Sequence, residues 1–220
     1  MNGFIKICGV TTHETVAAAA EAGATHLGFN FVSASPRFVS LDAAAALARA
    51  SILKSVAVTA DATDDALASI LTAFRPDFLQ LHGAEDPQRV AHVSARFGVP
   101  VIKAVGVSNA DDVRAARAYL TCADLLLFDA KPPSADLATP TGGHGKAFDW
   151  RILHGQKFSK PWFLSGGLTP ENIEAAILAS VPPGVDVASG VESVRGVKDI
   201  QRVKEFCLRA RRAYTAEAVA

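Results

Sequence analysis

The sequence predicts an α/β fold, a single-domain (β/α)8 TIM barrel, on three observations. Eight short apolar runs rich in β-branched residues recur along the chain. Alanine-rich stretches with helical spacing lie between these runs. The runs begin about 22 to 28 residues apart, with one longer gap before the seventh, and a regular period indicates a repeated supersecondary unit. An open doubly wound sheet also alternates strands with helices, but eight strands in a chain this short favour the closed barrel.

The expected strands are all short and end close to a glycine or a polar residue. In chain order they are FIKIC (4–8), HLGFNF (26–31), KSVAVT (54–59), FLQLH (78–82), VIKAV (101–105), LLLFD (125–129), WFLS (162–165) and VDVAS (185–189).

The expected helices fill the stretches between these strands, as in ETVAAAAEAGA and DDVRAARAYL. Most begin at an acidic or hydroxyl residue and end near Gly or Pro, as helix caps require. After the seventh strand, Thr169 is expected to cap a helix that has Pro170 in its first turn. No linker divides the chain, so the barrel is expected over residues 1–212, followed by a frayed tail at 213–220.

Composition excludes several classes of protein. Half of the 220 residues are hydrophobic and the formal net charge is zero, which favours a large core and disfavours a nucleic-acid or membrane-surface partner. The start of the chain lacks the pattern of a signal peptide, and no long apolar segment predicts a membrane span. The three cysteines match neither a disulfide framework nor a zinc site, so we expect no metal and a cytoplasmic location.

The site is expected at the carboxyl ends of the strands, where barrel enzymes place their active sites. Cys8 stands at such an end, directly before Gly9. Residues i and i+2 of a strand point the same way, so Lys6 and Cys8 share one face of their strand. Gln80 and His82 likewise share a face, and polar pairs of this kind predict a polar barrel mouth.

Two strand ends have the composition of a phosphate cradle. SGGLTPENI follows the seventh strand and places Gly166 and Gly167 where backbone N–H groups can approach an anion. SGVESVRGVKD follows the eighth strand, and Ser189 and Gly190 offer donors of the same kind. Barrel enzymes often bind phosphate at these two loops, although both segments are also compatible with plain tight turns.

Several of these motifs together resemble one enzyme family. KICGVT, SPRFVS, FLQLHG, LLFDA, FLSGGLTPENI and VDVASGVESVRGVKD occur in the order and spacing of the phosphoribosylanthranilate isomerases, over nearly the whole chain. The resemblance implies a (β/α)8 barrel and an Amadori rearrangement in tryptophan biosynthesis, acting on N-(5-phosphoribosyl)anthranilate. A reaction of this kind needs one acid and one base, and no cofactor.

The resemblance also implies roles for individual residues. Cys8 would be the base, helped toward the thiolate by Lys6, and Asp129 would be the acid, kept protonated by its apolar strand. An inert core cysteine and a helix-capping aspartate are the alternatives. Arg37 would bind the anthranilate carboxylate, because its planar fork matches a carboxylate. As a plain surface arginine it would have no such role.

Three more side chains are candidates for contacts with the substrate. Gln80 and His82 are expected to line the pocket, although a structural histidine bonded to a backbone carbonyl is equally compatible with the sequence. Asp186 is a candidate for a ribose hydroxyl. The segment 130–147 is expected to form a lid, and it carries His144 where relatives usually have GGTG.

Other functions remain open at this point. An indole-glycerol-phosphate synthase would use a lysine acid and a glutamate base; Lys103 is available, but no expected strand ends in glutamate. A catalytically inactive barrel that binds a phosphorylated ligand is a further alternative. The expected partner is a small phosphorylated substrate, and the sequence allows either a monomer or a homodimer.

Overall fold

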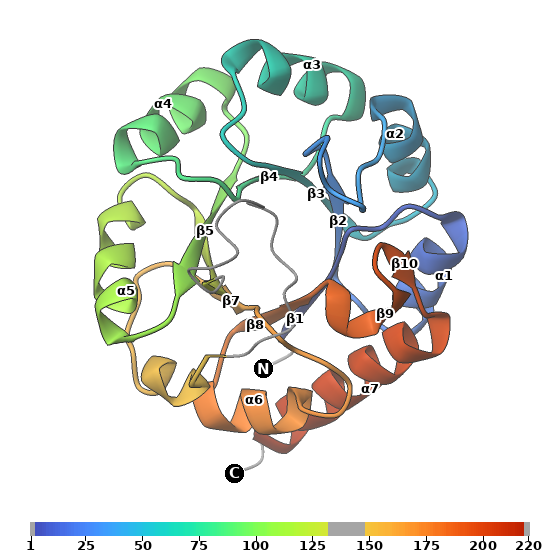
Figure 1. Ribbon diagram of the computed structural model, residues 1–220, viewed down its shortest axis with the longest axis vertical. Helices are drawn as coiled ribbons and strands as arrows, with labels where there is room; N and C mark the ends of the chain where they lie inside the picture. The colour runs from blue at the N-terminus through green and yellow to red at the C-terminus, as the bar shows by residue number, and fades with distance from the viewer. Residues whose placement is uncertain (1–2, 132–147, 218–220) are drawn as a thin grey trace.

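The computed structural model describes residues 3–131 and 148–217. Eight parallel strands form a closed barrel in chain order, and the eighth pairs with the first, which confirms the predicted (β/α)8 barrel (Figure 1). The strands are β1 (Phe4–Cys8), β2 (His26–Asn30), β3 (Lys54–Thr59), β4 (Phe78–Leu81), β5 (Val101–Val107), β6 (Leu125–Ala130), β7 (Trp162–Leu164) and β8 (Gly184–Val187).

Helices surround the barrel, and a small hairpin follows β8 (Figure 1). The α-helices are α1 (His13–Glu21), α2 (Leu41–Arg49), α3 (Asp64–Phe74), α4 (Pro87–Phe97), α5 (Ala110–Ala115), α6 (Ile173–Ser180) and α7 (Ile200–Glu217). Short 3₁₀ helices are η1 (Ala116–Tyr119), η3 (Trp150–Leu153) and η4 (Ser189–Val191). The hairpin pairs β9 (Glu192–Val194) with β10 (Val197–Lys198) in antiparallel fashion.

The first five α-helices begin with a side-chain cap, and in four of them the cap is an acidic or hydroxyl residue, as the sequence predicts. The cap residues are Thr12, Ser40, Thr63, Asp86 and Asn109, and each side-chain oxygen accepts a hydrogen bond from a backbone N–H of the first turn. A cap of this kind is worth about 1 kcal/mol. The local sequence therefore sets where these helices start.

Three segments differ from the prediction. Helix α6 begins at Ile173, so the prediction that Thr169 caps it is wrong: Asn172 accepts from the Thr169 N–H and donates to the Gly167 carbonyl, which folds this stretch into a turn. Within the described part of the connection from β6 to β7, the helical element is the short η3. Helix α7 continues to Glu217 and buries Tyr214, so it extends beyond the boundary expected at 212.

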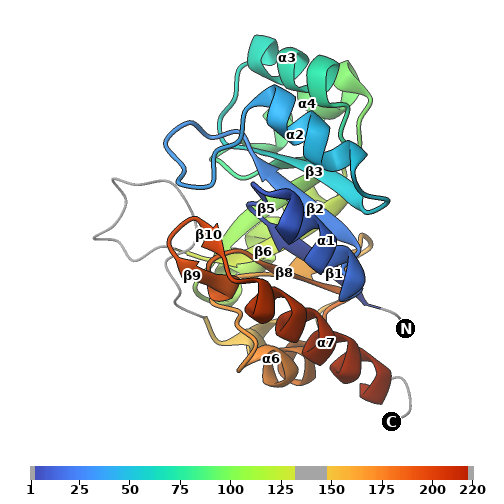
Figure 2. The same ribbon diagram turned by 90° about the vertical axis from the view of Figure 1, so that its right-hand side faces the viewer.

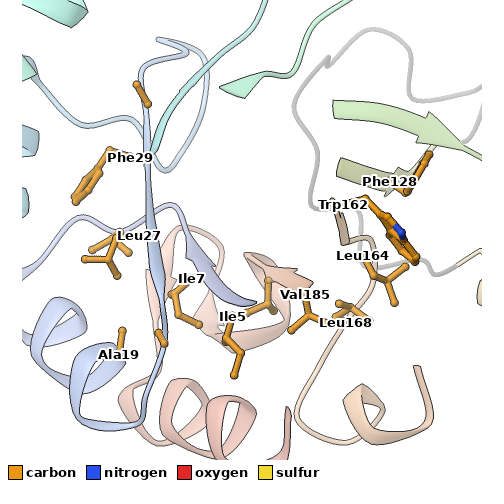
Figure 3. Close-up of a cluster of buried hydrophobic side chains, with 14 of the residues drawn as sticks. Ile5, Ile7, Ala19, Leu27, Phe29, Phe128, Trp162, Leu164, Leu168 and Val185 are labelled. Atoms are coloured by element: carbon orange, nitrogen blue, oxygen red, sulfur yellow. The ribbon is translucent and has the colours of Figure 1, made fainter. Parts of the chain in front are cut away.

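The outer core lies between the strands and the helices. Ile5 and Ile7 of β1 belong to this core with Leu27 and Phe29 of β2, and Figure 3 shows Leu27 near Ala19 of α1. The inner core fills the barrel and comprises Cys8, Val56, Val58, Ile102, Ala104, Leu125, Leu127 and Phe163. Alternation along the strands thus separates the two cores, as it must in a parallel barrel.

The two ends of the barrel differ in what they carry. The beginning of β1 and the end of α7 lie on one side of the molecule, and the β9–β10 hairpin lies on the other (Figure 2). The hairpin side is the carboxyl end of the strands, where the polar side chains described below converge. Within residues 3–131 and 148–217, no helix is long and apolar enough to cross a bilayer.

Candidate active site

A buried chain of polar side chains surrounds Cys8 on the inner face of the barrel. Lys6 is fully buried, and its Nζ donates to Asp186 Oδ1 over 2.7 Å. Asp186 Oδ2 in turn accepts from the Ser165 hydroxyl at 3.2 Å. A hypothetical Cβ on Gly28 would lie 2.9 Å from Cys8 Sγ and 3.2 Å from Lys6 Cε, so the missing side chain there leaves room for both.

The surroundings of Cys8 act on its thiol in opposite directions. Burial raises the pKa of Cys8, while the charges of Lys6 and Lys198 lower it, and burial prevails. The pKa of Lys6 is itself raised: burial lowers it, but Asp186 and Cys8 raise it further. Cys8 therefore has a buried cation beside it, which offsets part of the effect of burial on the thiolate.

Asp129 lies on the inner face of β6 and belongs to a second polar chain. His82 Nε2 is 3.2 Å from Asp129 Oδ2, and His82 Nδ1 is 2.7 Å from the Gln80 amide nitrogen. The other Asp129 oxygen accepts from the Ala130 N–H. His82 is thus bonded to two side chains, and its alternative role as a structural histidine on a backbone carbonyl does not match the structure.

Arg37 is buried and already holds a carboxylate. Its Nε and Nη2 donate to the two oxygens of Glu192 at 2.6 and 2.9 Å, and Glu192 also accepts from Lys198 Nζ at 2.9 Å. These cations and the Gly196 N–H lower the pKa of Glu192 to about 2, although burial raises it. The alternative of a plain surface arginine is wrong, because only 4% of Arg37 is exposed.

Glu192 and Lys198 also belong to the site, although neither was predicted from the sequence. Both belong to the hairpin after β8, and Lys198 also donates to the Ala188 carbonyl at 2.7 Å. The signal was present in the motif SGVESVRGVKD, where an acid and a base stand six residues apart. Arg37, the partner of Glu192, is more than 150 residues away in the chain, and no local pattern links the two segments.

The loops after β7 and β8 lie against each other at the same end of the barrel. Gly166 and Gly167 have φ angles of +86° and +68°, a backbone conformation that favours glycine. A Cβ on Gly190 would lie 1.8 Å from the Leu168 carbonyl oxygen, so the two loops are in direct contact. Ser189 begins η4 in the second loop. The structure thus brings together the four residues expected to bind phosphate, and their role as a cradle stays a prediction.

Lys103, the lysine that an indole-glycerol-phosphate synthase would need, points away from the barrel interior. Its Nζ donates to the carboxylate of the buried Glu85 at 2.9 Å and to the Gly83 carbonyl at 2.8 Å. The pair lies behind β4 and β5, where Tyr119 packs against it. In this position Lys103 cannot serve as the lysine acid of an indole-glycerol-phosphate synthase. The segment 132–147 with His144 lies outside the described residues.

The chain matches one family over most of its length. A family model described as N-(5'phosphoribosyl)anthranilate (PRA) isomerase matches residues 5–209. A protein of Paracoccus denitrificans named N-(5'-phosphoribosyl)anthranilate isomerase is 50% identical over 208 residues, covering 94% of this chain and 96% of the relative. One of Parvibaculum lavamentivorans with the same name is 45% identical, covering 97% of this chain and 100% of the relative.

Solved structures agree with these matches. The crystal structure of phosphoribosyl anthranilate isomerase from Thermotoga maritima has a TM-score of 0.84 and 33% identity, covering 95% of this chain and 98% of that chain. Another structure of this isomerase, in complex with reduced 1-(o-carboxyphenylamino)-1-deoxyribulose 5-phosphate, has a TM-score of 0.77 and 31% identity, with the same coverage. The barrel, the polar groups at its carboxyl end and these matches agree: this chain belongs to the N-(5'-phosphoribosyl)anthranilate isomerase family.

Proposed function

We propose that Cys8 and Asp129 are the base and the acid of an N-(5'-phosphoribosyl)anthranilate isomerase. The chain is an aldose–ketose isomerase of tryptophan biosynthesis, as its family membership establishes. It converts N-(5-phosphoribosyl)anthranilate to 1-(2-carboxyphenylamino)-1-deoxyribulose 5-phosphate. The observation that carries the assignment of residues is the placement of a thiol on β1 and a carboxyl group on β6 at the same end of one barrel interior.

Two proton transfers suffice for the reaction. Asp129 gives its proton to the ring oxygen of the ribose, the bond from that oxygen to C1 breaks, and an iminium forms. Cys8, as thiolate, then removes the proton from C2, which gives an enamine that tautomerises to the ketone. Lys6 stabilises the thiolate electrostatically, and Asp186 and Ser165 hold Lys6 in place.

The remaining candidates bind the two charged ends of the substrate. Glu192 occupies the Nε–Nη2 edge of Arg37, and the guanidinium keeps three further N–H donors for the anthranilate carboxylate. Gly166, Gly167, Ser189 and Gly190 would bind the phosphate through backbone N–H groups. Asp186 is committed to Lys6 and Ser165, so its contact with a ribose hydroxyl would use a remaining lone pair.

Two variants test the acid and the base. Cys8→Ser and Asp129→Asn should each lower kcat by about two to four orders of magnitude, because each removes one proton transfer. Cys122→Ser and Asp65→Asn are controls that make the same changes outside the barrel interior, and their kcat should stay near that of the wild type. Turnover is followed as the loss of substrate fluorescence in an assay that starts from anthranilate and phosphoribosyl pyrophosphate. Near-normal rates in both site variants would favour an inactive, ligand-binding barrel instead.

A third variant tests Arg37. Arg37→Lys keeps the positive charge but loses the fork, so KM for the anthranilate substrate should rise by about tenfold while kcat changes less. An unchanged KM would remove Arg37 from the carboxylate site.

The proposal extends to the location and the partners of the enzyme. Three free cysteines support a reducing, cytoplasmic location. A small phosphorylated substrate is the expected partner, and a related structure holds a phosphorylated compound. For the oligomeric state we propose a monomer or a homodimer, and a structural relative from Thermotoga maritima is described as dimeric.

A further inference from the structure

Gln80 has a buried side-chain amide, and its two polar atoms differ in their hydrogen bonding. The side chain is fully buried in the barrel interior on β4. Its Nε2 lies 2.7 Å from His82 Nδ1, whereas its Oε1 is buried and has no hydrogen-bond partner among the described residues. A buried carbonyl oxygen without a partner is costly, so the contact made by the amide nitrogen must stabilise this orientation of the amide.

The amide nitrogen determines where the proton of His82 resides. An amide NH₂ group can only donate, so the Nδ1 atom that faces it must accept with its lone pair. A neutral imidazole carries one proton, which must then be on Nε2. That atom lies 3.2 Å from Asp129 Oδ2. The order of donors is therefore Gln80 to His82 and His82 to Asp129.

We infer that Gln80 is a positioning residue that fixes the His82 tautomer with its proton on Nε2, so that His82 donates a hydrogen bond to Asp129. The consequence for catalysis rests on the proposed role of Asp129 as the acid. Once Asp129 has given its proton to the sugar, it is a carboxylate, and the His82 N–H stabilises that charge.

The Gln80 amide nitrogen also disfavours an N–H group on His82 Nδ1. An imidazolium would carry an N–H on Nδ1, directly opposite the N–H groups of the Gln80 amide. An imidazolium beside Asp129 would favour the carboxylate before the reaction begins, and the acid would then have no proton to give. The other titratable groups at this end of the barrel, Lys6 and Cys8 on β1, Asp186 on β8, Asp61 beside Gly83 and Lys131 beside Gly106, are unchanged in the variants below.

The tautomer can be read directly from the ¹⁵N NMR signals of the imidazole ring in the wild-type enzyme, with a His82→Gln variant to assign them. We expect the ¹⁵N signal of an unprotonated nitrogen for Nδ1 and that of a protonated nitrogen for Nε2 at neutral pH. A proton on Nδ1 would mean that Oε1 faces the ring and would overturn the inference. This readout assumes nothing about catalysis. A failure of the proposed function would instead appear as normal turnover in Asp129→Asn.

Two variants of Gln80 test the consequence. Gln80→Met removes the donor, so the ring should show mixed tautomers and accept a second proton more readily. The acid limb of kcat should then move to higher pH by about one unit. Gln80→Glu presents an acceptor to Nδ1 and should bring a second proton onto the ring, so that kcat falls by about tenfold or more at neutral pH with KM within about twofold.

The control is Gln88→Met, the same substitution at an exposed position of α4. Its ring signals and its pH profile should match those of the wild type. If Gln80→Met folds and keeps both the wild-type ring signals and the wild-type acid limb, Gln80 has only a packing role. If Gln80→Met does not fold, the isosteric Gln80→Glu decides the same question, and an unchanged ring in that variant would overturn the inference.

Discussion

At the scale of single residues, the site depends on the buried cation of Lys6 and on the groups beside it. Lys6 has no exposed surface, and a buried ammonium group is costly unless it is paired. Asp186 provides the partner at 2.7 Å, and Cys8 also interacts with the same lysine. The ion pair therefore keeps a positive charge beside a thiol whose own burial disfavours the thiolate.

Lys6→Met should make Cys8 a weaker acid. Burial already raises the pKa of the thiol, and the variant removes the larger of the two cationic effects that oppose it. The rate of alkylation of Cys8 by iodoacetamide, measured by mass spectrometry, should have its midpoint at higher pH than in the wild type. Loss of one partner of a buried pair should also lower the free energy of unfolding by about 3 kcal/mol.

Lys54→Met is the matched control, because Lys54 forms an exposed pair with Asp77. It should leave the Cys8 midpoint where it is and change stability by less than about 1 kcal/mol. An unchanged midpoint in Lys6→Met would mean that Lys6 serves only to balance Asp186.

At the scale of elements, the turn after β1 is shaped by the arginine that lies on it. Gly9 has a φ of +75°, and a Cβ there would lie 2.5 Å from Arg37 Cδ. The glycine therefore satisfies two requirements at once: an unusual backbone conformation, and room for the buried stem of Arg37. The hairpin residue Glu192 then fixes the guanidinium from the other side.

Gly9→Ala should affect substrate binding as well as stability. The left-handed conformation costs about 1 kcal/mol or more for alanine, and the new methyl group displaces Arg37. We expect KM for the anthranilate substrate to rise severalfold, measured together with urea unfolding. Gly98→Ala separates the two effects, because Gly98 has a φ of +62° but nothing within 4 Å of its Cβ position. Equal KM values in the two variants would contradict the role of Gly9 in placing Arg37.

Element-level features divide into those the sequence could predict and those it could not. The strands and the first five helix starts follow from local patterns, since each cap or apolar run acts within a few residues. The start of α6 was not predictable in this way, because the Thr169 hydroxyl accepts from the Glu171 N–H in a turn before the helix, and the Asn172 side chain holds this turn by accepting from the Thr169 N–H. The pairing of Arg37 with Glu192 depends on barrel closure, which brings the loop after β2 to the hairpin after β8.

At the scale of the whole molecule, the two ends of the barrel interior serve different purposes. The carboxyl end holds the charged groups of the candidate site, and the other end is closed by aromatic side chains around His26. The ring of His26 contacts Phe4, Phe78 and Phe163, and its Nδ1 is bonded to the Thr25 hydroxyl at 2.7 Å. Burial lowers the pKa of His26 from 6.5 to about 4, and the charge of Lys6 acts in the same direction.

This depressed pKa makes the stability of the barrel depend on pH between about 6.5 and 4. Above this window the histidine is neutral in both the folded and the unfolded chain. Within it the unfolded chain binds a proton that the folded chain does not, so the free energy of unfolding falls as the pH falls. The full effect is about 3 kcal/mol, from the difference of the two pKa values. Urea unfolding of the wild type from pH 7.5 to 4.5 should show this loss, and His26→Gln should show a shallower one. His13→Gln, which changes an exposed histidine at the start of α1, should follow the wild type. If His26→Gln loses stability as steeply as the wild type, the acid sensitivity arises elsewhere in the barrel.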